Sequence, residues 1–214
     1  MTSAVGMAEH RGIWFRNSAR VTALTVSEAQ YNYAREQTGG ADNPDYRLCR
    51  WEENGLPAAS MDAAVSIECF THVPDKEAYF REMHRVLKPS GRAAITVWMH
   101  NNDPRAWQVG HLIEPICYEG RLAGMGTADE YRELIEAAGL VVDDYQDWIR
   151  RVRKTWWICL RHLTERLFTS REYRRALRDK GLENRVFAVT LLRILFAYHI
   201  GVMRYGFFSL RRPD

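Results

Sequence analysis

The sequence has few cysteines and no pairing pattern among them. Its 214 residues include four cysteines (Cys49, Cys69, Cys117 and Cys159), which lie far apart and form no Cys-x-x-Cys pair. Such spacing argues against a structural zinc site, and it suits free thiols in a reducing compartment. We therefore expect no metal ion and a cytoplasmic location.

The sequence also lacks a long apolar run. The longest apolar segment, residues 186–200, is interrupted by Arg193 and His199. It falls short of the roughly 18 to 20 residues that cross a membrane. The first twenty residues contain no apolar stretch of the kind found in secretory signals. These features predict a soluble protein.

Negative charge is scarce in residues 150–180. Eleven basic residues stand there against three acidic ones, a net charge of +8, whereas the whole chain carries only +3. The rest of the chain therefore carries −5. A basic helical segment beside an acidic body can favour an anionic partner such as a lipid surface, a diphosphate or nucleic acid, although a solvated helix face explains the charge equally well. No nucleic-acid-binding motif accompanies it, so we expect no nucleic acid partner.

Short apolar strands alternate with amphipathic helices along the chain. This order predicts an α/β fold with a mostly parallel sheet covered on both faces. We expect a single domain over residues 1–214, with a cofactor-binding half at 20–100 and a substrate-side half at 101–214, and with helices 154–200 as a lid. The expected strands are 20–25, 46–50, 62–67, 92–98, 141–148 and 203–210, and the expected helices are 27–37, 75–87, 127–138, 156–168, 171–180 and 183–200. Residues 99–125, rich in Trp, Gly and Pro, predict an irregular region.

Four segments together resemble class I S-adenosylmethionine-dependent methyltransferases, in the branch with tocopherol, sterol and cyclopropane-forming methyltransferases. They are VTALTVSEAQ (21–30), RWEE (50–53), SIECFTHVPDKEAYFREMHRVLKPSGRAAITVW (66–98) and MRYGFFSL (203–210). The resemblance implies a Rossmann-like sheet with an antiparallel C-terminal strand, and S-adenosylmethionine as cofactor.

The resemblance also implies a set of site residues. Thr25 and Gln30 would flank the ribose and adenosine, and Trp51 with Glu52 would lie along the adenine. The residues that end the next strand, Ser66, Ile67 and Glu68, would approach the methionine part and the methyl group. His72 would face the acceptor, and it would act as a base only if the acceptor must lose a proton.

Each of these residues has a structural alternative. Gln30 suits a helix cap, Trp51 a core or edge position, Glu52 a solvated loop, and His72 a hydrogen bond to the loop backbone. Glu68 at a strand end is harder to explain in this way. The adjacent Trp156 and Trp157 suit lid packing as well as a stacking platform.

The chain departs from the family pattern at its beginning. Family members have an opening strand and a glycine-rich turn before the strand at 20–25, and residues 1–18 show no recognisable strand and no Gly-x-Gly. The missing strand would lie in the middle of the sheet, so we expect an N-terminally truncated sheet with an impaired cofactor site. Thr71 stands where a cyclopropane-forming enzyme would carry an acidic residue, which argues against that chemistry.

The leading hypothesis is methyl transfer from S-adenosylmethionine to a small, lipophilic acceptor, impaired in this chain. The rival is a non-catalytic methyltransferase-fold remnant that contacts a partner protein or an anionic membrane surface through residues 150–180. A nucleic-acid methyltransferase is disfavoured because no Asn-Pro-Pro-Tyr-type loop is present. The sequence does not determine the oligomeric state.

Overall fold

The computed structural model describes residues 2–5, 19–39, 42–171 and 184–214. The chain divides into two compact units. Unit 1 comprises Met1–Val97, Glu130–Gln146 and Phe207–Asp214, and unit 2 comprises Trp98–Asp129 and Asp147–Gly206. The expectation of a single domain with a cofactor half and a lid half stays a prediction.

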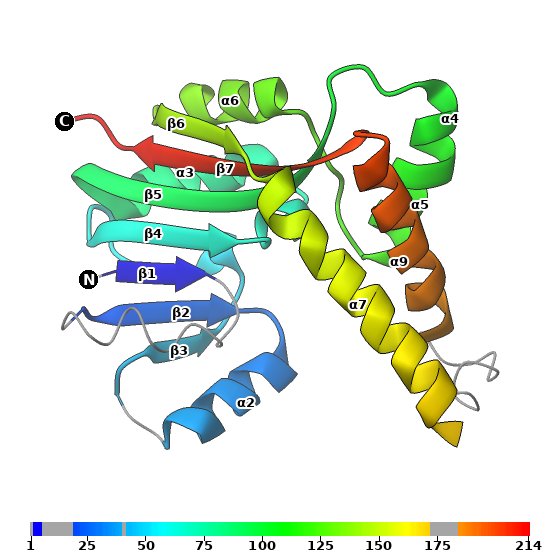
Figure 1. The fold of residues 1–214 in the computed structure, drawn as a ribbon. Helices are drawn as coiled ribbons and strands as arrows, with labels where there is room; N and C mark the ends of the chain where they lie inside the picture. Colours follow the sequence, from blue (N-terminus) through cyan, green and yellow to red (C-terminus); the bar gives the residue numbers. More distant parts are fainter. Residues whose placement is uncertain (1, 6–18, 40–41, 172–183) are drawn as a thin grey trace. The chain divides into compact units, whose positions relative to one another are not determined.

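The described strands form one seven-stranded sheet in the order β3-β2-β1-β4-β5-β7-β6. Their bounds are Thr2–Val5 (β1), Val21–Thr25 (β2), Asp45–Leu48 (β3), Met61–Ile67 (β4), Leu87–His100 (β5), Val141–Asp147 (β6) and Met203–Arg211 (β7). The first five pair in parallel, and β7 runs against them (Figure 1). The predicted α/β fold, with its mostly parallel sheet and antiparallel C-terminal strand, is confirmed.

Strand β1 fills the middle of the sheet, where the sequence analysis expected a gap. Its residues pair in parallel with β2 on one side and with β4 on the other, and Val5 stands opposite both Leu24 and Ser66 (Figure 1). The prediction of a sheet without this strand is therefore wrong. The physical reason is that a strand paired on both sides gains its stability from its neighbours, so four residues without a marked pattern suffice.

The described helices of unit 1 are α2 (Glu28–Thr38), α3 (Lys76–Val86) and α6 (Ala128–Ala137), the last of which begins in unit 2. Ser27 caps α2, since its side chain accepts a hydrogen bond from the Gln30 N–H, and Gly39, with a φ of 61°, ends the helix. Asp75 caps α3 in the same manner. Both α3 and α6 lie behind the sheet in Figure 1, which places their apolar sides against it.

An aromatic cluster joins these helices to the loop after β4. The ring of Phe70 lies 4.9 Å from that of Tyr79, 4.8 Å from that of Phe80 and 4.9 Å from that of Tyr131, and all four side chains are buried. The cluster therefore holds the start of α3 and the start of α6 at the carboxyl end of β4. In this way it positions the loop that carries Glu68 and His72.

The C-terminal residues return to unit 1 and secure the end of α3. The guanidinium of Arg212 donates to the carbonyl oxygens of His84 (3.1 Å) and Leu87 (2.6 Å). These carbonyls lie at the end of the helix, where carbonyl groups have no hydrogen-bond partners within the helix itself. Residues 207–214 thus complete unit 1 rather than trail from it.

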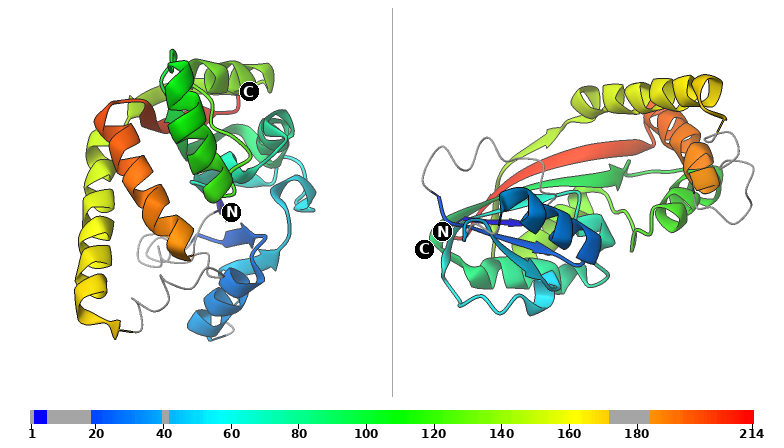
Figure 2. Two further views of the ribbon diagram at one scale, coloured as in Figure 1. Left: turned by 90° about the vertical axis from the view of Figure 1, so that its right-hand side faces the viewer. Right: turned by 90° about the horizontal axis from the view of Figure 1, so that it is seen from below.

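Unit 2 contains the helices α4 (Ala106–Gln108), η4 (Val109–Ile113), α5 (Glu114–Glu119), α7 (Ile149–Thr169) and α9 (Asn184–His199). In Figure 2, α7 and α9 lie side by side. The core of unit 2 includes Leu112 and Ile113 of η4 and Ile116 of α5. From α9 it includes Ile194, Ala197 and Tyr198. The predicted irregular region at 99–125 is therefore wrong, because burial of this apolar face stabilises helical structure despite Gly110 and Pro115.

Other predictions hold with shifted ends. Strand β5 begins at Leu87 rather than after the expected turn, and a register shift opposite Met61 and Ala63 absorbs the extra residues. The predicted helix at 171–180 lies, except for Arg171, outside the described residues. The lid role of 154–200 stays a prediction.

Among the described residues, no helix combines the length and apolarity that a membrane crossing requires.

Candidate functional site

The carboxyl ends of β2, β3 and β4 lie along one edge of unit 1. Thr25, the last residue of β2, stands opposite Leu48, the last residue of β3. Ile67 ends β4, which is separated from β2 by β1 alone. Strands lie about 4.8 Å apart, so these ends are roughly 10 Å from one another. Ligands of open parallel sheets bind at this edge.

The sequence analysis placed Thr25 and Gln30 together, and the structure brings them into contact. The Thr25 hydroxyl donates to the Gln30 side-chain carbonyl over 2.8 Å, and it accepts from the Ser27 N–H over 3.1 Å. Gln30 is exposed, so its amide group still faces solvent. Donors and acceptors of this kind suit the hydroxyls of a ribose.

Trp51 does not present a face to this edge. Its side chain is only 5% exposed, its ring lies 5.7 Å from that of Tyr79, and its indole N–H donates to the Tyr79 carbonyl over 3.0 Å. This placement favours the structural alternative, a core aromatic. Its neighbour Glu52 is partly exposed and pairs with Arg50 over 3.5 Å. The adenine-binding role of both residues stays a prediction.

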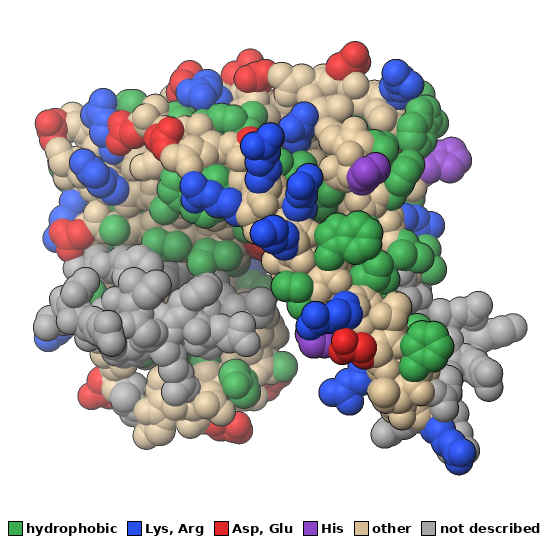
Figure 3. Space-filling view, viewed as in Figure 1, with side chains coloured by type: hydrophobic (Ala, Val, Ile, Leu, Met, Phe, Trp, Pro, Cys, Tyr) green, Lys and Arg blue, Asp and Glu red, His purple; other side chains and the backbone are tan. Residues whose placement is uncertain are grey.

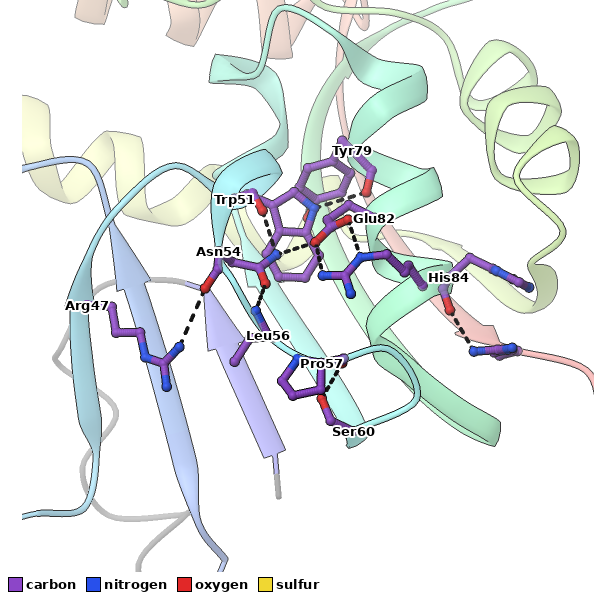
Figure 4. A network of polar contacts seen from close by, with 11 residues as sticks. Arg47, Trp51, Asn54, Leu56, Pro57, Ser60, Tyr79, Glu82 and His84 are labelled. Atoms are coloured by element: carbon purple, nitrogen blue, oxygen red, sulfur yellow. Dashed lines mark hydrogen bonds and ion pairs between the residues drawn. The ribbon is translucent and has the colours of Figure 1, made fainter.

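A buried polar network explains why Trp51 is held in the core (Figure 4). The Asn54 amide donates to the Trp51 carbonyl over 2.7 Å and to Glu82 over 2.6 Å, while its oxygen accepts from the Leu56 N–H over 2.7 Å. Glu82 in turn accepts two hydrogen bonds from Arg85. The loop after β3 is thereby fixed to α3, and nothing in the sequence pattern pointed to Asn54.

Ser66 is buried near the end of β4. Its hydroxyl and that of Tyr79 both lack a hydrogen-bond partner in the part of the chain that the structure describes. Burial raises the pKa of Tyr79 well above its usual range. The Ser66 hydroxyl lies near enough to oppose that shift, but the two groups do not meet hydrogen-bond geometry. An unpartnered buried hydroxyl at a strand end suits a ligand group that is polar and uncharged.

Glu68 follows β4 in a strained backbone conformation. Its φ is 56°, a region that residues other than glycine rarely adopt. Its N–H donates to the Thr96 carbonyl over 3.0 Å, and its carbonyl accepts from the Thr71 hydroxyl over 3.3 Å, so both neighbours hold the conformation. The Glu68 side chain is exposed where β4 ends. Strain of this kind gathers at functional sites.

His72 lies in the short helix η3 (Phe70–His72) and is exposed. Its backbone N–H donates to the Cys69 carbonyl over 3.0 Å. His72 thus lies between β4 and α3, in a short helix rather than in the expected loop, and its position facing the acceptor stays a prediction. Its role as a base stays a prediction.

Cys69 lies between Glu68 and η3 as a neutral thiol. Burial raises its pKa to about 11, and its sulfur bonds the Ile67 carbonyl over 3.2 Å. At pH 8 only about 0.1% of such a thiol is ionised, compared with tens of per cent for an ordinary cysteine. The group is therefore unsuited to act as a nucleophile.

We expect Cys69 to react with iodoacetamide at pH 8 at least about 100-fold more slowly in the folded protein than in the unfolded chain. Peptide mass spectrometry after timed quenching measures this rate for Cys69. The same peptide in denaturant serves as the control. Equal rates in the two states would contradict the described burial of the thiol.

Three exposed apolar side chains lie at this edge, and the sequence analysis did not identify them as a group. Val26 is 73% exposed, Leu48 47% and Ile67 37%, and they stand at or directly after the ends of β2, β3 and β4. In the described part of unit 1, Tyr33 is the one other large apolar side chain exposed to this degree. The signal available in the sequence was an apolar residue at each strand end, beside Thr25 and Glu68.

The residues at this edge fit the nucleotide cofactor that the resemblance implies. Adenine needs apolar cover, and Val26 and Leu48 are exposed apolar side chains at this edge. The ribose needs short polar groups, and Thr25 and Gln30 are of that kind. Ser66 and Glu68 offer a hydroxyl and a carboxylate near the end of β4. The described residues contain no cluster of histidine, cysteine or carboxylate side chains that could hold a metal ion.

Comparisons with known proteins show what kind of domain contains these strands. Residues 3–95, from β1 into β5, match the family described as "Methyltransferase domain". Tocopherol O-methyltransferase of Arabidopsis thaliana is 26% identical over 91% of this chain and 57% of its own length. The 27-O-demethylrifamycin SV methyltransferase of Amycolatopsis mediterranei is 27% identical over 92% of this chain and 71% of its own length.

A solved structure shows the same fold. Geranyl diphosphate C-methyltransferase from Streptomyces coelicolor, in complex with S-adenosyl-L-homocysteine, aligns with a TM-score of 0.72 at 19% identity, over 99% of this chain and 73% of that one. The chain thus spans a little over half the length of the Arabidopsis relative. Residues 3–95 thus match a methyltransferase domain, and the sheet order agrees with the Rossmann-like fold of S-adenosylmethionine-dependent methyltransferases.

Proposed function

We propose that this chain binds S-adenosylmethionine at the carboxyl edge of β2, β3 and β4 and transfers its methyl group to a small lipophilic acceptor. The carrying observation is the exposed apolar set Val26, Leu48 and Ile67 beside the polar Thr25 and Glu68. Exposed apolar side chains that gather at one edge of a sheet can mark a ligand or partner site.

Different residues bind different parts of the cofactor in this proposal. Val26 and Leu48 cover the adenine, and Thr25 with Gln30 bonds the ribose. Glu68 and the Ser66 hydroxyl face the methionine part, where the carboxylate attracts a positively charged group. The cofactor supplies a methyl group on a sulfonium, and the protein aligns it with the acceptor and excludes water. His72 accepts a proton only from an acceptor that must lose one.

Two observations support a lipophilic acceptor. The relatives are named for tocopherol and geranyl diphosphate, compounds with prenyl chains. Within unit 2, α9 exposes Val189, Leu192 and Phe196, which recur at helical spacing on one face. An apolar face of this kind suits contact with a lipophilic compound. The atom that is methylated is left open by these features.

The predicted impairment now depends on the glycine-rich turn alone, because β1 supplies the strand. Gly6 follows β1 in the sequence, and no Gly-x-Gly is present before β2. Calorimetric titration of the purified chain with S-adenosylmethionine tests both statements. Micromolar affinity would contradict impairment, whereas no binding at millimolar ligand would contradict the proposed site.

We expect Glu68→Gly to weaken S-adenosylmethionine binding by about tenfold while changing the free energy of unfolding by no more than about 1 kcal/mol. Glycine relieves the positive φ, which offsets its own entropic cost, and it removes the carboxylate. Titration calorimetry and urea unfolding measure the two quantities.

Glu68→Gln serves as the matched control for that substitution. It keeps the strained backbone and side-chain size but removes the charge, so it should weaken binding to a similar extent and leave stability unchanged. Unaltered affinity in both variants would contradict a role for the carboxylate.

The rival function, a methyltransferase-fold interaction protein without activity, predicts a different pattern. Such a protein would transfer no label from methyl-labelled S-adenosylmethionine to a panel of prenylated phenols and terpenoid diphosphates. Label transfer that is lost in Thr25→Val would support the proposed enzyme. Cofactor binding without any transfer across the panel would favour the rival.

A further inference from the structure

The outward face of α7 carries a stripe of basic and aromatic side chains. Arg150, Lys154, Trp157, Arg161 and Phe168 follow one another at spacings of four, three, four and seven residues, which place them on one side of the helix. All five are exposed, Trp157 by 61% and Phe168 by 85%. We call these five residues the α7 stripe.

Side chains on the opposite side of α7 pack against the core of unit 2. Val152 and Trp156 pack on the core that α9 shares, and the Trp156 ring lies 5.6 Å from that of Trp98 and 6.4 Å from that of Tyr198. The two adjacent tryptophans therefore have different environments. Trp156 packs against the core, whereas Trp157 is exposed and takes no part in that packing.

Charge on this helix is strongly one-sided. Six basic side chains stand in α7 against one acidic side chain, Glu165, a net charge of +5. Glu165 pairs with Arg161 over 3.4 Å and with His162 over 3.4 Å. Figure 3 shows Lys and Arg side chains along α7 with large apolar side chains between them. A surface of this kind is complementary to one that is both anionic and apolar.

We propose that the α7 stripe docks the protein on an anionic membrane surface. Lys and Arg side chains reach phosphate groups while their alkyl stems remain in an apolar layer, and Trp and Phe enter the headgroup boundary. From Arg150 to Phe168 the helix rises about 27 Å, enough to contact several headgroups. Nucleic acid would use the charge but gives exposed Phe168 no comparable environment.

This inference goes beyond the proposed function, since it requires neither cofactor nor methyl transfer. It would place a protein with a lipophilic acceptor at the surface where such compounds concentrate. The sequence analysis assigned a possible membrane contact to residues 150–180, and the proposal assigns it to residues of α7. Residues 172–180 lie outside the described part of the chain.

Co-sedimentation of the whole chain with vesicles tests the proposal. We expect binding to vesicles of phosphatidylcholine and phosphatidylglycerol, and little binding to phosphatidylcholine alone. Binding should weaken as salt is raised, because the Debye length falls to about 10 Å at 0.1 M salt. Equal binding to both vesicle types, or none to either, would overturn the proposal.

Charge reversal identifies the surface. Arg150→Glu with Lys154→Glu should lower partitioning to anionic vesicles at least about tenfold. Arg20→Glu with Arg92→Glu makes the same change of charge at exposed positions of unit 1, and it should have little effect. Equal losses in the two variants would show that net charge alone governs binding, and would overturn the assignment to α7.

Removal of the aromatics separates membranes from other anionic partners. Trp157→Ala with Phe168→Ala should lower partitioning about tenfold, whereas Trp107→Ala with Tyr118→Ala, also exposed in unit 2, should not. Circular dichroism confirms that each variant is folded. If the Trp157 and Phe168 variant loses nothing on vesicles, and double-stranded DNA competes with vesicles for the wild-type protein, the stripe is a nucleic-acid surface instead.

Discussion

Replacing Ala4 by proline is expected to lower the free energy of unfolding by about 3 kcal/mol or more. Ala4 stands opposite Ala23 of β2 and Val65 of β4 in a strand that is paired on both sides. Proline removes the backbone N–H from this ladder, and its ring disturbs the pairing, so a neighbouring carbonyl loses its partner. Against a total stability of about 5–15 kcal/mol, the change would be large. Urea unfolding followed by circular dichroism measures it.

Ala4→Gly provides the control for the role of β1. It keeps the N–H and costs only about 0.5–1 kcal/mol through backbone entropy. A proline variant no less stable than the glycine variant would show that residues 2–5 do not form the central strand. Loss of S-adenosylmethionine binding in the proline variant alone would connect this strand to the proposed site.

The second large effect is expected from Phe70→Ala, which should lower the free energy of unfolding by about 3–5 kcal/mol. Phe70 is fully buried, and its ring contacts Tyr79, Phe80 and Tyr131. Its removal leaves a cavity between α3 and α6 that cannot close without moving the loop after β4. Urea midpoints and slopes give the change in stability.

Two further variants define what the Phe70 result means. Phe70→Leu keeps most of the volume and should cost less than about 2 kcal/mol. Phe168→Ala deletes the same ring at an exposed position, and it should change stability by no more than about 0.5 kcal/mol. Similar losses for the buried and the exposed phenylalanine would contradict the described core.

Elements with a strong local pattern were predictable from the sequence. The apolar run of β4 and the apolar side of α3 identified these elements, and Ser27, Asp75 and Gly139 fixed helix ends through capping. Elements that depend on distant partners were not predictable. Strand β1 exists through its two neighbours, and the helix around Ile116 exists through burial against Ile194 and Ala197 of α9.

The same division applies to the candidate site. The contact of Thr25 with Gln30 joins residues five positions apart, and the family motif was enough to anticipate it. The burial of Trp51 depends on the Tyr79 carbonyl, 28 residues away, and on Asn54, which no motif marked. Exposure of Val26 and Leu48 emerges only when the strand ends are brought together, so the sequence alone could not reveal this apolar edge.

The return of residues 207–214 to unit 1 has a consequence for biosynthesis. A ribosome releases β4 and α3 long before Arg212, whose guanidinium bonds the carbonyls at the end of α3. Until those residues emerge, unit 1 lacks the part of β7 that residues 207–211 form. Contacts this distant in sequence slow folding, so we expect unit 1 to reach its final packing only after residues 207–214 have joined it.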